Sequence, residues 1–336
     1  MNPKRILISR TDAIGDVILT LPLAGILKEY YPESKIYFLG KTYTKDVIKL
    51  SKHVDEFINW SELEILTINE QIDKLKQFNL DSIIHIFPNR DIAKLAKKLG
   101  IKTRIGTSHR PYHWINCNKL INFSRKKSDL HEAQLNTKLL KPLGIERDFQ
   151  LDELVGYYGF RQATPLDSKF VELIDSSRFN LILHPKSKGS AREWGLDNFK
   201  KLIEILPKDE FKIFLSGTEE DGKLFRDELL GAEHVVDISG KMNLQEFISF
   251  INSADGLIAA STGPLHIAAA LGKIALGIYP PIRPMHPGRW KPLGTKADYL
   301  VQADECSDCR EGGSCHCMLE LNPELVYTKL MEYLRE

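Results

Sequence analysis

Short apolar segments alternate with helical patterns along almost the whole chain, and this alternation limits the possible folds more than any other feature. The segments with the length and composition of strands are 4–10, 35–40, 82–88, 179–185, 211–217, 233–240, 255–261 and 273–280. Helical spacing of apolar residues marks segments between them, such as 16–32, 91–100 and 131–145. Nearly continuous apolar strands are typical of a parallel sheet covered on both faces. The sequence therefore predicts an α/β fold.

A softer stretch after residue 150 separates two such series. We expect two doubly wound, Rossmann-like domains facing across a cleft, residues 1–160 and 161–320. An amphipathic helix at 321–336 follows, and it can return to pack on the first domain. Ligands bind beyond the carboxyl ends of strands in such sheets, so residues that directly follow strands are the best candidates for a site.

Charge is distributed unevenly although the net charge is only +1. Residues 1–150 hold 25 Lys and Arg against 17 Asp and Glu, and no acidic residue lies between Asp91 and Asp129. The ten basic residues of that stretch form either a solvated face or a surface for a phosphorylated or carboxylated partner. No apolar run is long enough to span a membrane and no signal-peptide pattern opens the chain, so we expect a cytoplasmic protein.

The first candidate motif, RTDAIGDV at 10–17, directly follows the first strand. Gly15 permits a tight turn, and Asp16 lies where the next helix begins. A carboxylate at this point can be a simple helix cap or a reactive group, and Asp12 has the same two interpretations.

Two further motifs follow strands in the second half of the chain. LHPKSKGSAREW, at 183–194, offers Ser187, Lys188 and Arg192, which can hydrogen-bond and neutralise a diphosphate. ASTGPLH, at 260–266, leads into a helix whose first amides form a natural pyrophosphate site, with His266 beside it.

Several motifs are absent. The sequence has no G-x-G-x-x-G after the first strand, no phosphate-binding P-loop and no Asp-x-Asp pair, so we expect no cofactor and no catalytic metal. Four cysteines, Cys306, Cys309, Cys315 and Cys317, form a cluster that predicts either bound zinc or a structured loop with free thiols.

Taken in order, R-x-D-x-x-G-D, a loop ending in cation-x-Trp and T-G-x-x-H-I-A-A-A-L-G resemble the ADP-heptose:lipopolysaccharide heptosyltransferase family over about residues 4–280. The resemblance implies glycosyltransferase family 9, the GT-B architecture and metal-free, inverting transfer of a heptose from ADP-heptose to the lipopolysaccharide core. It implies a nucleotide-sugar donor and an anionic glycolipid acceptor, which is compatible with peripheral contact at the cytoplasmic face of the inner membrane. No nucleic acid is expected as a partner.

The resemblance also implies roles for particular residues. The catalytic base falls on Asp16. The donor-binding residues that it implies are Arg192, Glu220 (with Glu219 as an equally good register), Met242, Thr262, Gly263 and His266. The chemistry of the two loops adds Ser187, Lys188 and Ser261 as expected donor contacts. The excess of basic residues in the first half of the chain, and not the resemblance, predicts the residues that bind the acceptor, which are Arg10, Arg110, Arg125, Lys126 and Lys127. Many heptosyltransferases have Asp where this chain has Ser261, so a carboxylate able to bind sugar hydroxyls is missing and the donor sugar and nucleobase stay open.

Two other functions fit the same motifs. One is a nucleotide-sugar epimerase of similar two-domain build, which needs no second substrate. The other is a non-catalytic protein that binds a sugar nucleotide. Transfer, epimerisation and binding alone are the outcomes that distinguish the three.

Overall fold

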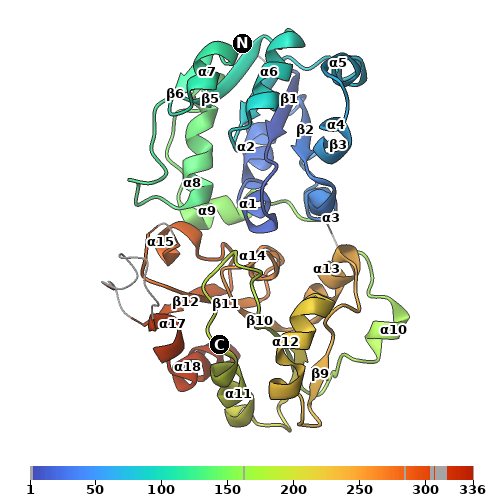
Figure 1. The fold of residues 1–336 in the computed structure, drawn as a ribbon, viewed down its shortest axis with the longest axis vertical. Helices are drawn as coiled ribbons and strands as arrows, with labels where there is room; N and C mark the ends of the chain where they lie inside the picture. The colour runs from blue at the N-terminus through green and yellow to red at the C-terminus, as the bar shows by residue number, and fades with distance from the viewer. Residues whose placement is uncertain (1–2, 162, 284, 303–305, 307–315, 336) are drawn as a thin grey trace. The chain divides into compact units, whose positions relative to one another are not determined.

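We describe the computed structural model of the chain, which covers residues 3–161, 163–283, 285–302, 306 and 316–335. The chain divides into two compact units, Met1–Gln162 and Ala163–Glu336. Each unit is built around a parallel six-stranded sheet with helices packed on it (Figure 1). The predicted α/β fold is confirmed, and none of the helices described is long and apolar enough to cross a bilayer.

The sheet of the first unit has the strand order β3-β2-β1-β4-β5-β6. Its strands are β1 Arg5–Ser9, β2 Lys35–Gly40, β3 Glu56–Asn59, β4 Ser82–His85, β5 Thr103–Thr107 and β6 Lys119–Ile121. Its helices are α1 Ile14–Ile18, α2 Pro22–Tyr30, η1 Thr42–Thr44, α3 Lys45–Leu50, α4 Trp60–Leu63, α5 Ile68–Lys76, α6 Arg90–Lys98, α7 Pro111–Asn116, α8 Glu132–Thr137, η2 Lys138–Leu143 and α9 Leu151–Gly156.

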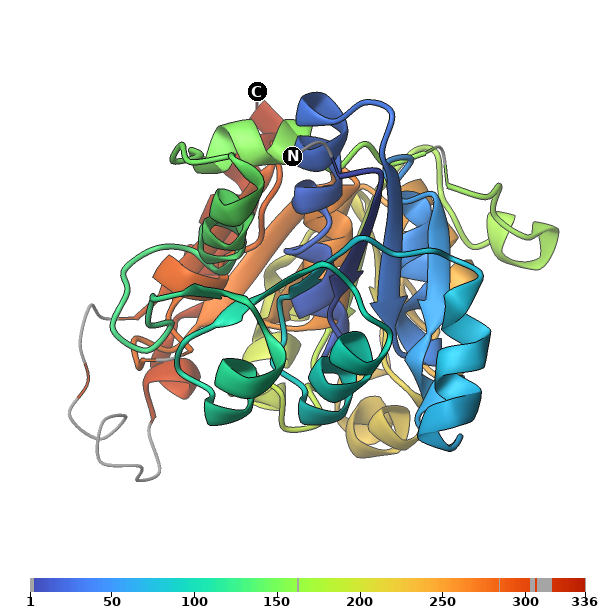
Figure 2. The same cartoon turned by 90° about the horizontal axis from the view of Figure 1, so that it is seen from above.

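Helices cover both faces of this first sheet (Figure 2). Successive residues of a strand point to opposite faces, yet Ile6, Leu7 and Ile8 of β1 are all buried. On one face, Leu7 belongs to a cluster that also contains Ile92 and Leu95 of α6. Burial on both faces explains why the central strands read as unbroken apolar runs.

The sheet of the second unit has the order β12-β11-β10-β7-β8-β9. Its strands are β7 Phe179–His184, β8 Phe211–Leu215, β9 Val235–Asp237, β10 Gly256–Ala260, β11 Ile274–Tyr279 and β12 Ala297–Val301. Its helices are α10 Ser168–Val171, α11 Leu196–Ile205, α12 Glu219–Leu229, α13 Leu244–Ser253, α14 Gly263–Ala270, α15 Pro287–Trp290, α17 Cys317–Glu320 and α18 Pro323–Arg335. Val326 and Leu330 of α18 join Phe199 of α11 in the core of this unit.

The prediction of one helix over 16–32 is wrong. The structure has α1 and α2 instead, separated at residues 19–21. Pro22 lies at the start of α2, where its missing N–H leaves no hydrogen bond unmade. Inside a longer helix the same proline would remove one bond and clash with the preceding turn. Because of this break, α1 is a short helix of five residues, Ile14–Ile18, with Asp16 at its centre.

Candidate active site

A buried arginine, Arg10, organises the carboxyl end of β1. Its side chain is only 4% exposed, and it donates to three carboxylates. Nε and Nη2 bind the two oxygens of Asp12 at 2.8 and 2.9 Å, and Nη1 binds Glu132 Oε1 at 2.9 Å. Nη2 also donates to Asp16 Oδ1. Two of these carboxylates come from the RTDAIGD turn and the third from α8, more than a hundred residues later in the chain.

Asp16 is positioned by the turn rather than used as a helix cap. The residue at the N-cap of α1 is Ala13, which makes no side-chain cap, while the Asp16 carboxylate accepts from Arg10. The carbonyl of Asp16 accepts a 2.8 Å hydrogen bond from the Thr20 hydroxyl, which fixes the backbone below it. The side chain is 20% exposed, so a substrate group can reach it.

On the other side of Arg10, Glu132 is a fully buried carboxylate held between two guanidinium groups. Arg125 Nε donates to the Glu132 oxygen that also accepts from Arg10, at 3.0 Å. Arg125 Nη2 reaches Asn136 Oδ1 at 3.0 Å, one helical turn beyond Glu132 on α8. The side-chain amide of Asn136 donates a 3.2 Å hydrogen bond to Thr20 Oγ1. These residues form a closed network around Asp16, and we call Arg10, Asp12, Asp16, Arg125, Glu132 and Asn136 the carboxylate network.

Burial raises the pKa of Asp16 to about 7. The Arg10 charge opposes this shift, but the neighbouring carboxylates of Asp12 and Glu132 add to it. For Arg10 itself, burial lowers the pKa, and the three carboxylates outweigh burial so that the pKa ends above its usual range. Arg10 therefore stays charged while Asp16 can gain or lose a proton near neutral pH, as a general base requires.

Glu132 and Asn136 were not singled out by the sequence, and the structure shows why they belong here. HEAQLN, at 131–136, predicts only a helix, but residues four apart share one helical face, and that face meets Arg10. His131 caps the helix by accepting from the Ala133 amide at 3.2 Å. The spacing of Glu132 and Asn136, two polar residues four apart on one helical face, was the feature of the sequence that could have predicted their role.

The predicted acceptor-binding residues fall into two groups. Arg10 and Arg125 donate to the carboxylate network, whereas Arg110, Lys126 and Lys127 are exposed. Lys126 and Lys127 lie in the connection between β6 and α8, beside a pocket of about 520 Å³. Contact of any of these residues with an acceptor stays a prediction.

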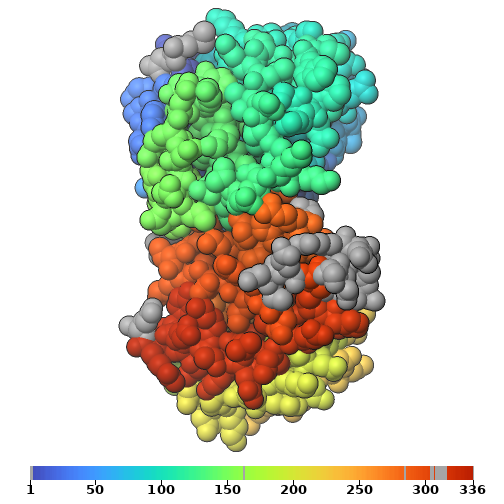
Figure 3. Space-filling view, turned by 90° about the vertical axis from the view of Figure 1, so that its left-hand side faces the viewer, coloured from blue at the N-terminus to red at the C-terminus, as the bar shows by residue number. Residues whose placement is uncertain are grey.

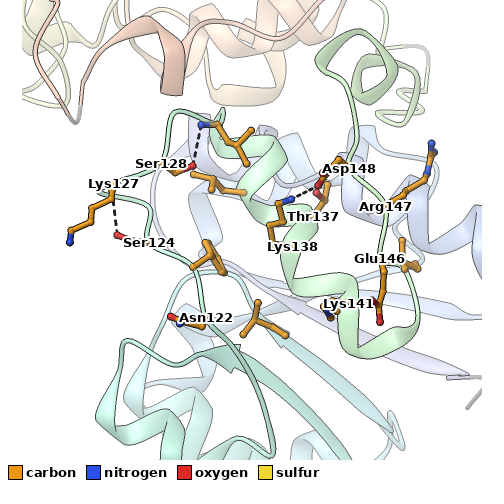
Figure 4. Close-up of a pocket in the computed structure, with 15 residues that line it drawn as sticks. Asn122, Ser124, Lys127, Ser128, Thr137, Lys138, Lys141, Glu146, Arg147 and Asp148 are labelled. Carbon is orange, nitrogen blue, oxygen red and sulfur yellow. Dashed lines mark hydrogen bonds and ion pairs between the residues drawn. The ribbon is translucent and has the colours of Figure 1, made fainter.

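The pocket combines an apolar lining with cations (Figure 4). Its lining includes Ile121, Phe123, Leu130, Leu135 and Ile145 together with Lys127, Lys138 and Lys141. In Figure 4, Lys138 points to Asp148, with which it forms an ion pair, and Lys127 extends away from both. One face of α8 thus lines this pocket while Glu132 and Asn136 on another face hold the carboxylate network.

In the second unit, the loop after β7 is ordered by its own glutamate. Glu193 Oε1 accepts from the Ser187 amide at 2.9 Å, and Oε2 binds Lys186. Lys188 has a φ of 50°, a backbone conformation that L residues rarely adopt. Its side chain is exposed. Arg192 is half-buried and forms no hydrogen bond or ion pair with any residue that the structure describes. Ser187 is thus used within the loop, while Lys188 and Arg192 are available to a ligand.

The N-terminus of α14 has the features of an anion site. Thr262 is the N-cap residue, yet its hydroxyl makes no cap hydrogen bond, and its buried Oγ1 has no partner in the described part of the chain. A buried polar atom without a partner is unfavourable, so a ligand that bonds it is favoured. Gly263 and Pro264 follow, and His266 is buried in the first turn. Ser261, half-buried, directly precedes Thr262.

The start of α12 distinguishes the two glutamates considered for the donor. Glu219 is bound by both terminal nitrogens of Arg226, each at 2.7 Å. Glu220 lies beside it without that ion pair. A hydrogen bond from its own backbone N–H lowers the pKa of Glu220 most, and the Thr218 hydroxyl and the Lys188 charge lower it further. Met242 is half-buried between β9 and α13. Glu220 is therefore the better candidate for a ligand contact.

The cysteine cluster lies partly outside the described residues. Cys309 and Cys315 belong to the part that is not described, whereas Cys306 and Cys317 are described and half-buried. Among the residues that are described, no group of three or more His, Cys, Asp or Glu could hold a metal ion.

Known proteins resemble the chain in sequence and in structure. Residues 70–317 match the family model of glycosyltransferase family 9 (heptosyltransferase). A Haemophilus influenzae protein named as a glycosyltransferase is 27% identical over 301 residues, which is 86% of each chain. The lipopolysaccharide core heptosyltransferase OpsX of the same organism is 24% identical, over 82% of this chain and 79% of its own. ADP-heptose lipopolysaccharide heptosyltransferase II of Escherichia coli, 18% identical, superposes with a TM-score of 0.77 over 98% of each chain.

Proposed function

Because the chain belongs to glycosyltransferase family 9, the heptosyltransferase family, we propose that it moves a heptose from ADP-heptose to the inner core of lipopolysaccharide. The fold supports this proposal, since the structure has the GT-B fold of the heptosyltransferases, as predicted. The observation that carries the mechanism is the Asp16 carboxylate, whose pKa is raised to about 7 at the carboxyl end of β1.

In the proposed reaction, Asp16 removes the proton from an acceptor hydroxyl. The hydroxyl oxygen forms a bond to the anomeric carbon of the donor as the bond from that carbon to the diphosphate breaks. The proton ends on Asp16 and the electron pair leaves with the nucleotide diphosphate. Attack from the face opposite the leaving group inverts the anomeric centre. A carboxylate with a pKa near the working pH combines a sufficient deprotonated fraction with adequate basicity.

Arg10, Arg125 and Glu132 are positioning residues in this proposal. Arg10 fixes one oxygen of Asp16, and Glu132 holds Arg10 in place from its other side. Arg125 balances the charge of Glu132 at 3.0 Å. A buried carboxylate without such partners would be strongly destabilising. The network therefore fixes one oxygen of Asp16 through Arg10, while the side chain keeps 20% of its surface exposed toward a possible acceptor.

The donor diphosphate is proposed to bind in the second unit. The Thr262 hydroxyl lacks a partner among the described residues, and the first amides of α14 are free to bond an anion. Arg192 and Lys188 supply positive charge as the leaving group becomes more negative. Glu220 is proposed to accept hydrogen bonds from ribose hydroxyls, and Met242 to contact the base. These groups would stabilise the diphosphate without a divalent metal.

We propose that the acceptor binds in the first unit, at the pocket below the β6–α8 connection. Its cations suit the phosphates and carboxylates of a lipopolysaccharide core, and Lys126, Lys127 and Arg110 extend the positive surface. An acceptor of this kind is held in a membrane leaflet, so the enzyme would work in peripheral contact with it.

Single-turnover reactions test the proposal. Purified protein would be mixed with a heptose-free core glycolipid and ADP-heptose, or with UDP-sugars as controls, and the products separated by mass. Heptose transfer from the ADP donor, unchanged by EDTA and with an inverted anomeric centre by NMR, is expected. Epimerised donor without transfer, or binding without any product, would each contradict it, and activity that needs added magnesium would contradict the metal-free mechanism.

A further inference from the structure

Three large apolar side chains lie on the surface of the first unit, on α7 and the neighbouring edge strand β6. Trp114 is 65% exposed, Ile115 69% and Leu120 39%. The only residue of α7 that is buried is His113. Helix α7 therefore directs its largest apolar side chains outward. We call Trp114, Ile115 and Leu120 the apolar patch.

The register of the sheet brings these residues to one face. A Cβ added to Gly106 of β5 would meet His113 Nδ1 at 2.5 Å and Cys117 Sγ at 2.9 Å, so Gly106 faces α7. Leu120 is the register partner of Gly106 across the β5–β6 pair, so it points to the same face, beside α7. Ile121, the next residue, points to the opposite face and lines the pocket. Leu120 thus extends the surface that α7 begins.

The patch is held in position rather than left loose. The Trp114 indole donates to the Ser108 carbonyl at 2.7 Å, which fixes the ring against the start of the turn. Lys97 of α6 donates to the Ile115 carbonyl at 2.9 Å, which ties α6 to the end of α7. A tryptophan with its N–H bonded and its ring exposed matches the preference of this residue for a membrane–water interface.

Positive charge surrounds the apolar patch. The exposed lysines and arginines between residues 94 and 119 are Lys94, Lys97, Lys98, Lys102, Arg110 and Lys119. None of them forms a salt bridge with a described residue, and the sequence has no acidic residue between Asp91 and Asp129. In the space-filling view this part of the chain, coloured teal to green, forms a continuous outer surface of the first unit (Figure 3).

We propose that the apolar patch and its surrounding cations form a docking surface for an anionic membrane. Trp114, Ile115 and Leu120 would enter the interface, while the cations lie over phospholipid or lipopolysaccharide phosphates. Charge complementarity favours this occupant, since basic residues near an anionic leaflet are attracted to its surface. An apolar centre within a cationic rim fits a surface that is anionic outside and apolar beneath.

Vesicle cosedimentation of the full chain tests the apolar patch. The double variant Trp114→Ser, Ile115→Ser should bind vesicles containing phosphatidylglycerol at least about tenfold more weakly than the wild type. The matched control is Ile65→Ser, which removes an 81% exposed isoleucine from the same unit and should bind normally. Circular dichroism and turnover of a water-soluble acceptor fragment should be unchanged in all variants. Normal vesicle binding by the double variant would overturn the proposal.

The cations are tested separately. Reversing Lys98, Lys102 and Lys119 to Glu should abolish the preference for anionic over phosphatidylcholine vesicles, and added salt should weaken wild-type binding. The matched control reverses three exposed lysines of the second unit, Lys200, Lys201 and Lys208, and should keep the preference for anionic vesicles. Equal losses in the two triple variants would overturn the proposal. So would an effect of Trp114→Ser on self-association alone, which would indicate a contact between copies. Vesicle binding needs no transfer reaction, so its failure is distinguishable from failure of the proposed function.

Discussion

One guanidinium shared by three carboxylates supports the proposal that Asp16 acts as a base beside an arginine. A single Arg–Asp pair would favour the ionised carboxylate and make it a weak base. Here Arg10 is divided among Asp12, Asp16 and Glu132, and burial adds a cost to every charge. The balance leaves the pKa of Asp16 at about 7. A carboxylate with this pKa fits the proposed role of Asp16, which is to accept a proton in the transition state and release it afterwards.

We expect Asp16→Asn to remove transfer and to leave donor affinity within a few fold. An amide cannot accept the proton, and loss of a general base lowers a rate by about 10²–10⁴-fold. The measurement is single-turnover transfer together with ADP titration. The control is Asp46→Asn, which changes another acidic residue in the first turn of a helix, α3. Near-normal turnover by folded Asp16→Asn would exclude it as the base.

Glu132→Gln should move the acidic limb of the pH–rate profile to lower pH. The Glu132 charge helps to raise the pKa of Asp16, so its removal lowers that pKa, and Asp16 stays deprotonated at lower pH. In the wild type, kcat/KM should therefore fall as the pH decreases below neutrality. In the variant, the same fall should begin at a lower pH. A reduced rate with an unmoved profile would show that Glu132 only supports the fold.

Arg192→Ala should weaken ADP binding more than adenosine binding. Arg192 makes no hydrogen bond or ion pair with the residues described, so its charge is available to the diphosphate. Calorimetric titration with both ligands measures the difference, and Lys200→Ala, an exposed cation on α11, is the control. An equal loss for ADP and adenosine would contradict contact with the diphosphate.

At the scale of elements, α8 and the segment before it connect the base to the expected acceptor surface. Arg125 bonds the buried Glu132, whereas Lys126 and Lys127 are exposed on the same segment. Changing all three together would disturb the carboxylate network as well as the surface. Only the two lysines report on the acceptor.

Reversing Lys126 and Lys127 to Glu should raise the acceptor KM and leave the donor KM unchanged. Attraction between exposed charges is screened over about 8 Å at physiological ionic strength, so the difference from the wild type should shrink as salt is added. Lys4 and Lys74, exposed on the first unit, are the matched control pair. Wild-type acceptor kinetics in the variant at low salt would show that these lysines are only a solvated face.

The strands and turns that could be predicted are those whose residues carry a clear local pattern, such as a continuous apolar segment followed by a glycine-containing turn. The apolar residues of β1, 6–8, and of β10, 257–260, are continuous, and the turns after these strands carry Asp16 and Thr262. β6 has three residues with an exposed lysine and leucine, so it resembles a loop until its pairing with β5 is known. Glu132 escaped prediction for a related reason, because its partner Arg10 lies 122 residues away along the chain. Local pattern identifies strands and turns, whereas a buried ion network depends on contacts distant in sequence.

At the scale of the whole molecule, each unit holds a histidine just where a central strand ends, and His85 is buried while His184 is half-buried. His85 ends β4, and burial lowers its pKa to about 3, with His113 and Arg104 adding to the shift. His184 ends β7, and burial lowers its pKa to about 4. Both are neutral in the folded protein at every pH where the enzyme would work. Neither ring nitrogen of His85 has a hydrogen-bond partner in the described residues, so nothing offsets a charge there.

These histidines should make the protein lose stability as the pH falls below about 6.5. In the unfolded chain a histidine gains a proton near that pH, while in the folded state His85 does not until about pH 3. The unfolded state therefore binds more protons, and the free energy of unfolding falls by about 1.4 kcal/mol per pH unit for each such histidine. Above pH 6.5 both states are neutral and no change is expected from this source.

Urea unfolding at pH 7.5 and pH 5 tests this with His85→Leu, which removes the titrating ring from a site where its nitrogens have no partner. The loss of stability between the two pH values should be smaller in the variant by about 2 kcal/mol, whatever the variant's stability at pH 7.5. His109→Gln is the control, because His109 is exposed and its replacement should leave the pH dependence unchanged. If His85→Leu and His109→Gln showed the same pH dependence, the neutral state of His85 in the folded protein would be excluded.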